Sequence, residues 1–480
     1  MRRLSALALG GLLGLLAACG GGGGGDVPAP PTALPDTAVP DAVAPVVPGP
    51  GPGPVIPVVV PPDVPAPGGS AECSDSNQRA WLQTYMQDQY FWNQPLRAPL
   101  ATAPDLNAYF RSMLNLPLDR YSYTQRAQAF EQLYAEGTRT GYGYTLVWTD
   151  IAQTQLRVRY VEPRGPAAAA GLRRGDRVLS IDGLGPRAIA QGQLPAVTSP
   201  GVIRRFTVAG ADGQQRDLVA TSVNFPLSSV SHATVFDVPT AQGTARVAYL
   251  AYHEFIIASE SDLDRAFQQF NSAGATELVL DLRYNGGGSV VLARGLASML
   301  GGTRTDGKTF ADIRFNSRNA DRNFVLPMTT NIGILPGPVL RGLTRVFVIT
   351  SPSTASASEL VINALRPFMP VVLVGGTTFG KPYGFQPRTS CGVTYSAVNF
   401  ETLNALGQGR YESGFSPDCE VPDDLDRELG HPQEARLAAA LHHVRFGVCP
   451  AAPAGALARR TPAPPATPIG EAGVPQMWLQ

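Results

Sequence analysis

The chain has almost no lysine and few charged residues of any kind. Of its 38 basic residues, 36 are arginine, and the two lysines are Lys308 and Lys381. Charged residues make up 16% of the chain, and the formal net charge is zero. A protein that binds nucleic acid carries a basic patch or stripe, so we expect no nucleic-acid partner. The scarcity of lysine also makes a lysine in an unusual setting informative.

The sequence also lacks a hydrophobic run of about 20 residues, the length that spans a bilayer. Residues 4–16 form a shorter apolar run, preceded by Arg2 and Arg3. This pattern predicts a signal peptide over residues 1–19. The string Leu-Ala-Ala-Cys that ends at Cys19 resembles a bacterial lipobox, which implies a lipid-anchored protein of the bacterial cell envelope. Gly20 favours the outer membrane, and the alternative is an ordinary signal peptide with a chance cysteine.

Cysteine is scarce as well. Four remain besides Cys19, and an even number in an exported chain predicts disulfides. Three pairings are open. We favour Cys391–Cys419, which would close a local loop, and Cys73–Cys449, which would tie the ends of the folded part. No cysteine or histidine cluster has zinc-ligand spacing, so we expect neither a metal nor another cofactor.

Composition and hydrophobic periodicity divide the rest of the chain into five parts. Residues 20–70 are rich in glycine and proline and predict an extended tether. Residues 71–137 place apolar side chains three and four apart and predict a small helical unit. Residues 138–224 contain short strands, and residues 225–449 alternate apolar strands with helices. Residues 450–480 are rich in proline and alanine and predict a disordered tail.

The part with short strands resembles a PDZ domain of the bacterial protease type. The resemblance rests on G-P-A-A-x-A-G-L at residues 165–172 and G-D-x-V-x-x-I-D-G at residues 175–183. It implies that a peptide C-terminus binds by strand addition. A packing module without a ligand is the alternative. By resemblance, the loop that would bind the carboxylate consists of Gly141, Tyr142, Gly143 and Tyr144.

Residues 225–449 predict a largely parallel sheet with helices on its faces, because strands and helices alternate along the chain. Three unusual turns follow strands, at residues 283–288, 351–358 and 375–381. Ligand sites in such sheets lie beyond the carboxyl ends of the strands. We therefore expect these three turns to form one site.

Two side chains in these turns suit nucleophilic catalysis. Ser356 precedes a predicted helix, where unpaired N–H groups stabilise negative charge, although a serine there is also a common N-cap. Lys381 follows a buried strand in a chain that otherwise uses arginine. Guanidinium stays charged, whereas a buried lysine loses its proton more readily and can then deprotonate a serine. The retention of Lys308 shows that a lysine can also persist without such a role.

The glycines of the first turn leave backbone N–H groups open and, with the N–H of Ala357, could form an oxyanion hole. A tight turn that needs positive φ is the other explanation for these glycines.

Together the three turns resemble the carboxyl-terminal processing (tail-specific) serine proteases. The motifs are D-L-R-Y-N-G-G-G at residues 281–288, S-A-S-E at 356–359 and T-F-G-K at 378–381, and the lysine lies 25 positions after the serine. The resemblance implies an α/β, crotonase-like core with a largely parallel sheet, preceded by the helical unit and the PDZ-like domain. It also implies roles for single residues: Ser356 as nucleophile, Lys381 as general base, and Gly287 and Ala357 as oxyanion donors.

The chain departs from the family pattern after the lysine. The family typically has glutamine four residues later, but here Gln386 lies five residues after Lys381. Gln386 either orients Lys381 through a one-residue bulge or has a structural role. The resemblance implies a serine endopeptidase that cleaves unstructured or C-terminal polypeptide segments through an acyl-enzyme. The displaced glutamine motivates an alternative, a non-catalytic envelope scaffold that binds peptide tails.

Overall fold

The computed structural model describes residues 73–116, 118–330 and 339–451, together with the backbone of residues 469–470 and 476–478. The predicted signal peptide, Cys19 and the predicted tether lie outside the described residues. Within the described part, every helix is too short or too polar to cross a bilayer.

A six-stranded sheet forms the centre of residues 225–449. Five strands run parallel, and the edge strand β9 pairs antiparallel with β10. A largely parallel core sheet agrees with the fold class predicted from the sequence. In spatial order the strands are β21 (Cys419–Glu420), β16 (Val371–Gly375), β15 (Val346–Thr350), β11 (Glu277–Asp281), β10 (Gly243–Tyr252) and β9 (Val230–Thr240).

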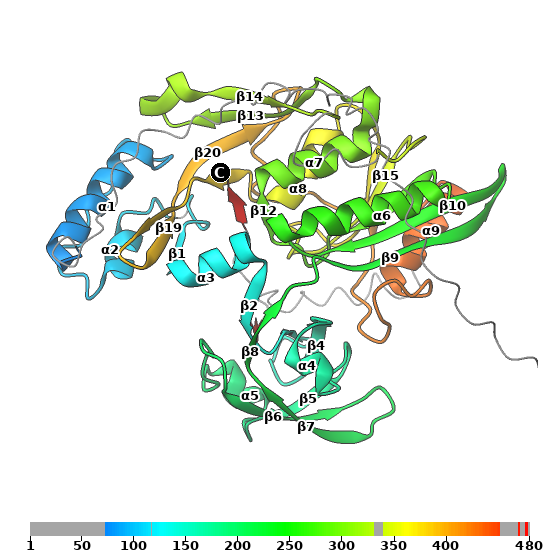
Figure 1. Cartoon of the computed structure of the whole chain (residues 1–480), viewed down its shortest axis with the longest axis horizontal. Helices are drawn as coiled ribbons and strands as arrows, with labels where there is room; N and C mark the ends of the chain where they lie inside the picture. The colour runs from blue at the N-terminus through cyan, green and yellow to red at the C-terminus, as the bar shows by residue number, and fades with distance from the viewer. Residues whose placement is uncertain (1–72, 117, 331–338, 452–468, 471–475, 479–480) are drawn as a thin grey trace, which may run out of the picture. The chain divides into compact units, whose positions relative to one another are not determined.

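Helices cover both faces of this sheet (Figure 1). Alternate side chains of β10 enter different cores: Leu250 packs in the cluster that contains α6, α7 and α8, and Tyr249 packs in the cluster that contains α9. A strand buried on both faces is apolar throughout, which is why the sequence shows it as a continuous run. The helices are α6 (Glu260–Ser272), α7 (Val290–Gly301), α8 (Ala357–Leu365) and α9 (Ala435–Phe446).

A second six-stranded sheet lies beside this core. Its strands, in spatial order, are β12 (Gly287–Ser289), β23 (Gln476–Trp478), β17 (Tyr383–Phe385), β20 (Val398–Leu403), β13 (Thr309–Phe315) and β14 (Phe324–Pro327). Because β23 comes from the end of the chain, this sheet joins segments that are almost 200 residues apart in sequence (Figure 1).

The N-terminal unit packs on the second sheet through an aromatic cluster. Trp81 and Tyr85 lie one turn apart on the same helix with ring centroids 5.5 Å apart. The unit also contains a strand that the helical pattern does not predict. Its elements are α1 (Asp75–Gln89), α2 (Leu106–Ser112), β1 (Tyr123–Arg126), α3 (Ala127–Glu131) and a π-helix (Gln132–Glu136), and β1 pairs with β19 (Val393–Ser396) and through it with β18 (Arg388–Ser390).

Residues 138–226 form a β-rich domain with a core of its own. Its sheet has the order β22-β3-β4-β5-β6-β7, in which β22 comes from the C-terminal segment. The elements are β2 (Thr138–Gly141), β3 (Tyr144–Trp148), β4 (Leu156–Val161), α4 (Pro166–Ala169), β5 (Arg177–Ile181), α5 (Pro186–Ala190), β6 (Ile203–Ala209), β7 (Gln215–Thr221), β8 (Val223–Pro226) and β22 (Ile469–Gly470). Single 3-10 turns elsewhere span Ile257–Ser259, Gly302–Arg304 and Ser317–Arg322.

The four cysteines form two disulfides, but the pairing that we favoured from the sequence is wrong. The bonds join Cys73 to Cys391 and Cys419 to Cys449. Cys391 lies in the turn between β18 and β19, on which the start of α1 packs, whereas Cys419 lies at the edge of the central sheet, near the end of α9. The chain between Cys391 and Cys419 moves from one sheet to the other, so closeness in sequence is misleading here.

The C-terminal segment also differs from the expectation of disorder. Two short strands form within residues 450–480: β22 pairs with β3, and β23 lies between β12 and β17. Composition alone does not reveal such pairing, because the hydrogen-bonding partners come from distant parts of the chain.

Candidate active site

Ser356 lies at the sharp turn between β15 and α8. Its backbone has φ 63° and ψ −115°, a region that non-glycine residues rarely occupy and that costs about 1–3 kcal/mol. The side chain is fully buried, and its Oγ has no hydrogen-bond partner among the described residues. Ser356 and Glu359 are arranged as a capping box, in which the Ser356 N–H donates to Glu359, but the hydroxyl itself makes no hydrogen bond to a described residue. A strained, buried serine with an unused hydroxyl fits a nucleophile better than an N-cap.

Lys381 is also fully buried, at the end of the turn that follows β16. Burial lowers the pKa of its amine well below the ordinary value, and the carboxylates of Asp119 and Glu359 oppose this effect. Its Nζ lies 3.7 Å from the ring centroid of Phe385. Among the described residues, Lys381 included, none is a hydrogen-bond partner of Ser356 Oγ.

Glu359 connects the serine turn to the lysine turn. One carboxylate oxygen accepts hydrogen bonds from the N–H groups of Ser356 and Lys381, at 2.9 and 2.8 Å. The other accepts from the Gly380 N–H, at 2.7 Å, and from the Thr378 hydroxyl. Burial raises the pKa of Glu359, while these four donors favour the carboxylate. The single buried side chain of Glu359 thus fixes the backbone at both Ser356 and Lys381.

Asn285 connects the glycine turn to the serine turn. Its carbonyl oxygen accepts hydrogen bonds from the Ala355 N–H and the Ser358 hydroxyl, both at 3.1 Å. Its side-chain Oδ1 accepts from the Gly287 N–H at 2.8 Å. The three turns predicted from the sequence therefore do meet at one place, as their positions after parallel strands indicated.

The two predicted oxyanion donors differ in their present state. Ala357 is the first residue of α8, so the helix itself offers no partner for its N–H. The Gly287 N–H is occupied by Asn285 and must leave that acceptor before it can bind a substrate oxygen.

A buried ion network supports the glycine turn from behind. Arg283 is 1% exposed and donates to Asp281 and, at 2.7 and 2.8 Å, to Glu434. Burial acts against its charge, but the two carboxylates outweigh this and raise the pKa of Arg283. The β-rich domain contacts the same region, since Arg174 donates to Tyr284 Oη at 2.7 Å.

The structure does not bring Gln386 to Lys381. Its Oε1 accepts a hydrogen bond from Arg322 at 2.9 Å. Successive side chains of a strand point to opposite faces, and Phe385 already faces the lysine. The pairing of β17 with β20 does shift register between Gly384 and Phe385, but this irregularity leaves Gln386 bonded to Arg322, and the position four residues after Lys381 presents an aromatic ring instead.

The residues of the predicted carboxylate loop connect β2 to β3. The carbonyls of Tyr142 and Gly143 accept hydrogen bonds from Ala167 and Glu162, which fold the loop over α4. Both tyrosine rings, of Tyr142 and Tyr144, are buried in the domain core. The edge of the adjoining strand β3 pairs with β22, so strand addition at this edge is observed.

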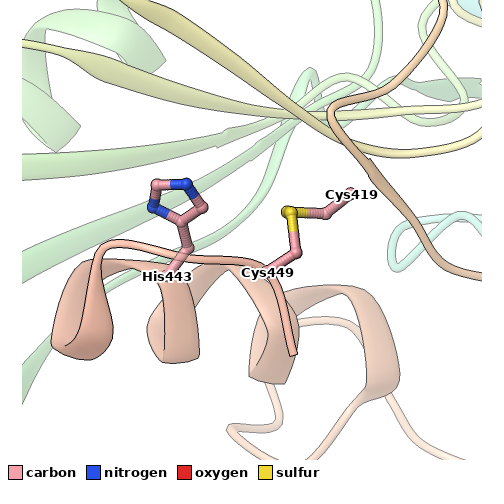
Figure 2. Close-up of side chains that lie close together, drawn as sticks. All are labelled: Cys419, His443 and Cys449. Atoms are coloured by element: carbon pink, nitrogen blue, oxygen red, sulfur yellow. A yellow bond between two sulfur atoms is a disulfide. The ribbon is translucent and has the colours of Figure 1, made fainter. Parts of the chain in front are cut away.

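Cys419, His443 and Cys449 bring their sulfur and nitrogen atoms within 4.8 Å of one another (Figure 2). Metal-binding cysteine is a thiolate, and both sulfur atoms here are joined in a disulfide. This group therefore offers no thiolate ligands while the bond is intact.

Comparison with known proteins matches this geometry to a family. The model of peptidase family S41 matches residues 246–421, which include all three turns, and a PDZ-domain model matches residues 157–184. The chain thus contains a peptidase family S41 region and a PDZ domain. The S41 family uses a serine–lysine dyad for peptide hydrolysis, and both matched families imply peptide substrates.

Known relatives align with this chain over most of their length. It is 23% identical to the chloroplastic C-terminal processing peptidase of Tetradesmus obliquus, over 75% of this chain and 78% of that one. It is 25% identical to the carboxyl-terminal-processing protease of Picosynechococcus, over 72% and 81%. A crystal structure assigned to the S41 proteases, from Bacteroides fragilis, aligns with a TM-score of 0.60 at 26% identity, over 76% of this chain and 96% of that one.

Two residues of the peptidase site were not assigned roles from the sequence. The pattern S-x-x-E at Ser356 and Glu359 is a capping-box signature and could have indicated Glu359. Asn285 follows a buried strand within the glycine turn, but its contacts to the serine turn depend on the packing of two strands and leave no sequence signal.

Proposed function

We propose that the chain is an endopeptidase of the cell envelope in which Ser356 is the nucleophile and Lys381 the general base. The observation that carries this proposal is the buried pair: a strained serine with an unused hydroxyl and a lysine whose pKa is lowered by burial, both fixed by Glu359. Neutral lysine is the form that can accept a proton.

The reaction follows from these positions. Neutral Lys381 takes the proton of the Ser356 hydroxyl as Oγ attacks the carbonyl carbon of the substrate. The N–H groups of Ala357 and Gly287 stabilise the oxyanion. The C–N bond then breaks, the Lys381 ammonium protonates the leaving amine, and an ester to Ser356 remains. Water, deprotonated by Lys381, hydrolyses this ester and restores the enzyme.

The substrates are unstructured or C-terminal segments of polypeptides. A strand added to the edge of β3 is held by backbone hydrogen bonds, which a folded substrate cannot offer. A lipid at Cys19 would anchor the protein to the outer membrane, and the sequence around Cys19 supports this location.

The dyad is tested by cleavage of an unfolded polypeptide with the purified chain and its variants. Ser356→Ala and Lys381→Ala should each lose at least about 10³-fold in kcat/KM, since members of a catalytic unit fail together. Ser353→Ala, in the same turn, and Lys308→Ala, the other lysine, are the matched controls and should retain activity. Undiminished cleavage by Ser356→Ala or Lys381→Ala would exclude this dyad. Peptide binding without turnover in any variant would favour the scaffold function.

The location is tested separately by labelling cells with a radioactive fatty acid. The wild-type chain should carry the label and fractionate with outer membranes, whereas Cys19→Ser should not be labelled. An unlabelled wild-type chain would contradict the lipid anchor.

A further inference from the structure

The end of the chain enters both peptide-binding regions of the molecule. Residues 469–470 form β22, which pairs antiparallel with β3 of the PDZ domain at Thr145 and Leu146. Residues 476–478 form β23, which pairs with two strands of the candidate active site. One short segment therefore contacts two sites that serve external peptides in the proposed function.

The place of β23 is specific. The order of the sheet is β12-β23-β17, so β23 is the single strand between β12 and β17. Neighbouring strands lie about 4.8 Å apart, which leaves room for one strand and no more between these two. Figure 1 shows β23 as the red arrow beside β12, near the C-terminal end of the chain.

Both neighbours of β23 belong to the catalytic machinery. β12 begins at Gly287, the proposed oxyanion donor, and its register places Gly287 opposite Gln476. β17 follows Lys381 by two residues and contains Phe385, whose ring contacts the lysine. A peptide bound as a strand between β12 and β17 would lie along the catalytic turns, so β23 occupies the position that a substrate strand needs.

The structure describes the catalytic turns with this strand in place. Ser356 Oγ makes no hydrogen bond to another described residue, and the Gly287 N–H is held by Asn285. The strand is therefore bound while one of the two proposed oxyanion donors is occupied within the protein.

The number of residues in the connection limits how far the segment can reach. Cys449 is tied to β21 by its disulfide, and 20 residues separate it from Ile469. A chain of that length spans up to about 70 Å, and the six residues from Gly470 to Gln476 span up to about 20 Å. A tethered segment has an effective concentration in the millimolar range, so even weak strand pairing can keep it bound.

We propose that the strands β22 and β23, residues 469–470 and 476–478, are a built-in ligand that competes with external polypeptides, at the edge of β3 and between β12 and β17. This inference rests on the proposed function for its consequence, the inhibition of cleavage, but not for the binding itself. Release of the segment, by an external peptide that outcompetes it, then makes the enzyme active.

Binding is measured without catalysis, in chains that carry Ser356→Ala. The probe is a fluorescent synthetic peptide of residues 466–480, titrated into the full chain and into a chain that ends at Pro465. The shortened chain should bind the peptide at least about tenfold more tightly, because it lacks the tethered competitor. Equal affinity for the two chains, or no binding to the shortened one, would overturn the proposal.

A full-length variant separates strand pairing from mere length. Proline has no N–H to donate to a strand, so Ile469→Pro combined with Met477→Pro should release the segment and bind the peptide like the shortened chain. Ala463→Pro, outside both strands, is the matched control and should behave like the unmodified full chain. A proline pair that leaves the affinity unchanged would argue against the observed pairing.

Cleavage of an unfolded polypeptide, with Ser356 intact, gives the functional result. The shortened chain and the proline pair should cleave at least about tenfold faster than the full chain at low substrate concentration. If no chain cleaves, the proposed function fails, while the peptide titration still decides whether the segment binds. A shortened chain that cleaves no faster than the full chain would contradict the inhibitory role.

Discussion

Glu359→Gln is the change that tests most sharply how the site is held together. Both carboxylate oxygens of Glu359 act only as acceptors, and the four hydrogen bonds come from three N–H groups and the Thr378 hydroxyl. Glutamine has almost the same shape, but its NH2 group cannot accept a hydrogen bond. Two of the donors would therefore lose their partner inside the protein. They are either the N–H groups of Ser356 and Lys381, or the Gly380 N–H and the Thr378 hydroxyl.

The expected magnitude follows from this count. A buried donor left without a partner costs about 1–3 kcal/mol, so two cost about 2–6 kcal/mol in the free energy of unfolding. The turns that carry Ser356 and Lys381 would also be less well fixed, and a displacement of about 1 Å can reduce the rate about 10²-fold. We expect the loss mainly in kcat, with KM little changed, because Glu359 is a positioning residue and does not contact substrate.

Urea denaturation and steady-state kinetics on an unfolded polypeptide measure both effects. Glu131→Gln, at an exposed position, is the matched control and should change stability by less than about 0.5 kcal/mol. Glu359→Asp keeps the charge but shortens the side chain, and we expect it to lie between the wild type and Glu359→Gln. A Glu359→Gln variant with wild-type stability and wild-type kcat would refute the reasoning.

Three further predictions concern the base, the ion network and the disulfides. Because burial lowers the pKa of Lys381, the neutral base should accumulate as pH rises through that lowered value, and kcat/KM should rise and level off well below the ordinary lysine pKa. A Lys381→Arg variant should be inactive at every pH. A rise of kcat/KM only near the ordinary lysine pKa would contradict the lowered value. Arg283→Leu should lower the free energy of unfolding, measured by urea denaturation, by about 3–5 kcal/mol, because it leaves Asp281 and Glu434 buried without a cation. Arg314→Leu breaks an exposed pair and should lower it by less than about 1 kcal/mol. Equal losses would show that the network does not stabilise the fold. Cys449→Ser opens a loop of 30 residues and should lower the free energy of unfolding by about 3–4 kcal/mol. Cys73→Ser opens a loop of 318 residues and should lower it by about 2 kcal/mol more. The reverse order in denaturation would contradict the loop-entropy argument.

The parts of the fold that could be predicted from the sequence are those with local signals. The helix predicted to follow Ser356 does begin there and spans residues 357–365 in the structure. The alternation of apolar strands and helices correctly predicted the parallel sheet. The convergence of the three turns followed from the general rule on strand ends.

The rest depended on contacts between distant segments. The disulfide pairing required knowledge of which sheet each cysteine joins, and Cys391 and Cys419 belong to different ones. The orientation of Gln386 depended on the face of β17 that Phe385 takes. The strands at residues 469–470 and 476–478 exist only through pairing with β3 and with β12 and β17, so their proline- and alanine-rich surroundings predicted disorder.

The most direct test of the central claim, that Ser356 forms the acyl-enzyme, is peptide mass spectrometry after acid quenching of the reaction with a slowly hydrolysed peptide ester. We expect the added mass of the acyl group on the proteolytic fragment that contains Ser356, and its absence from the same fragment of Ser356→Ala and of Lys381→Ala. An acyl group on another residue, or cleavage by a chain that never carries one on Ser356, would contradict the mechanism.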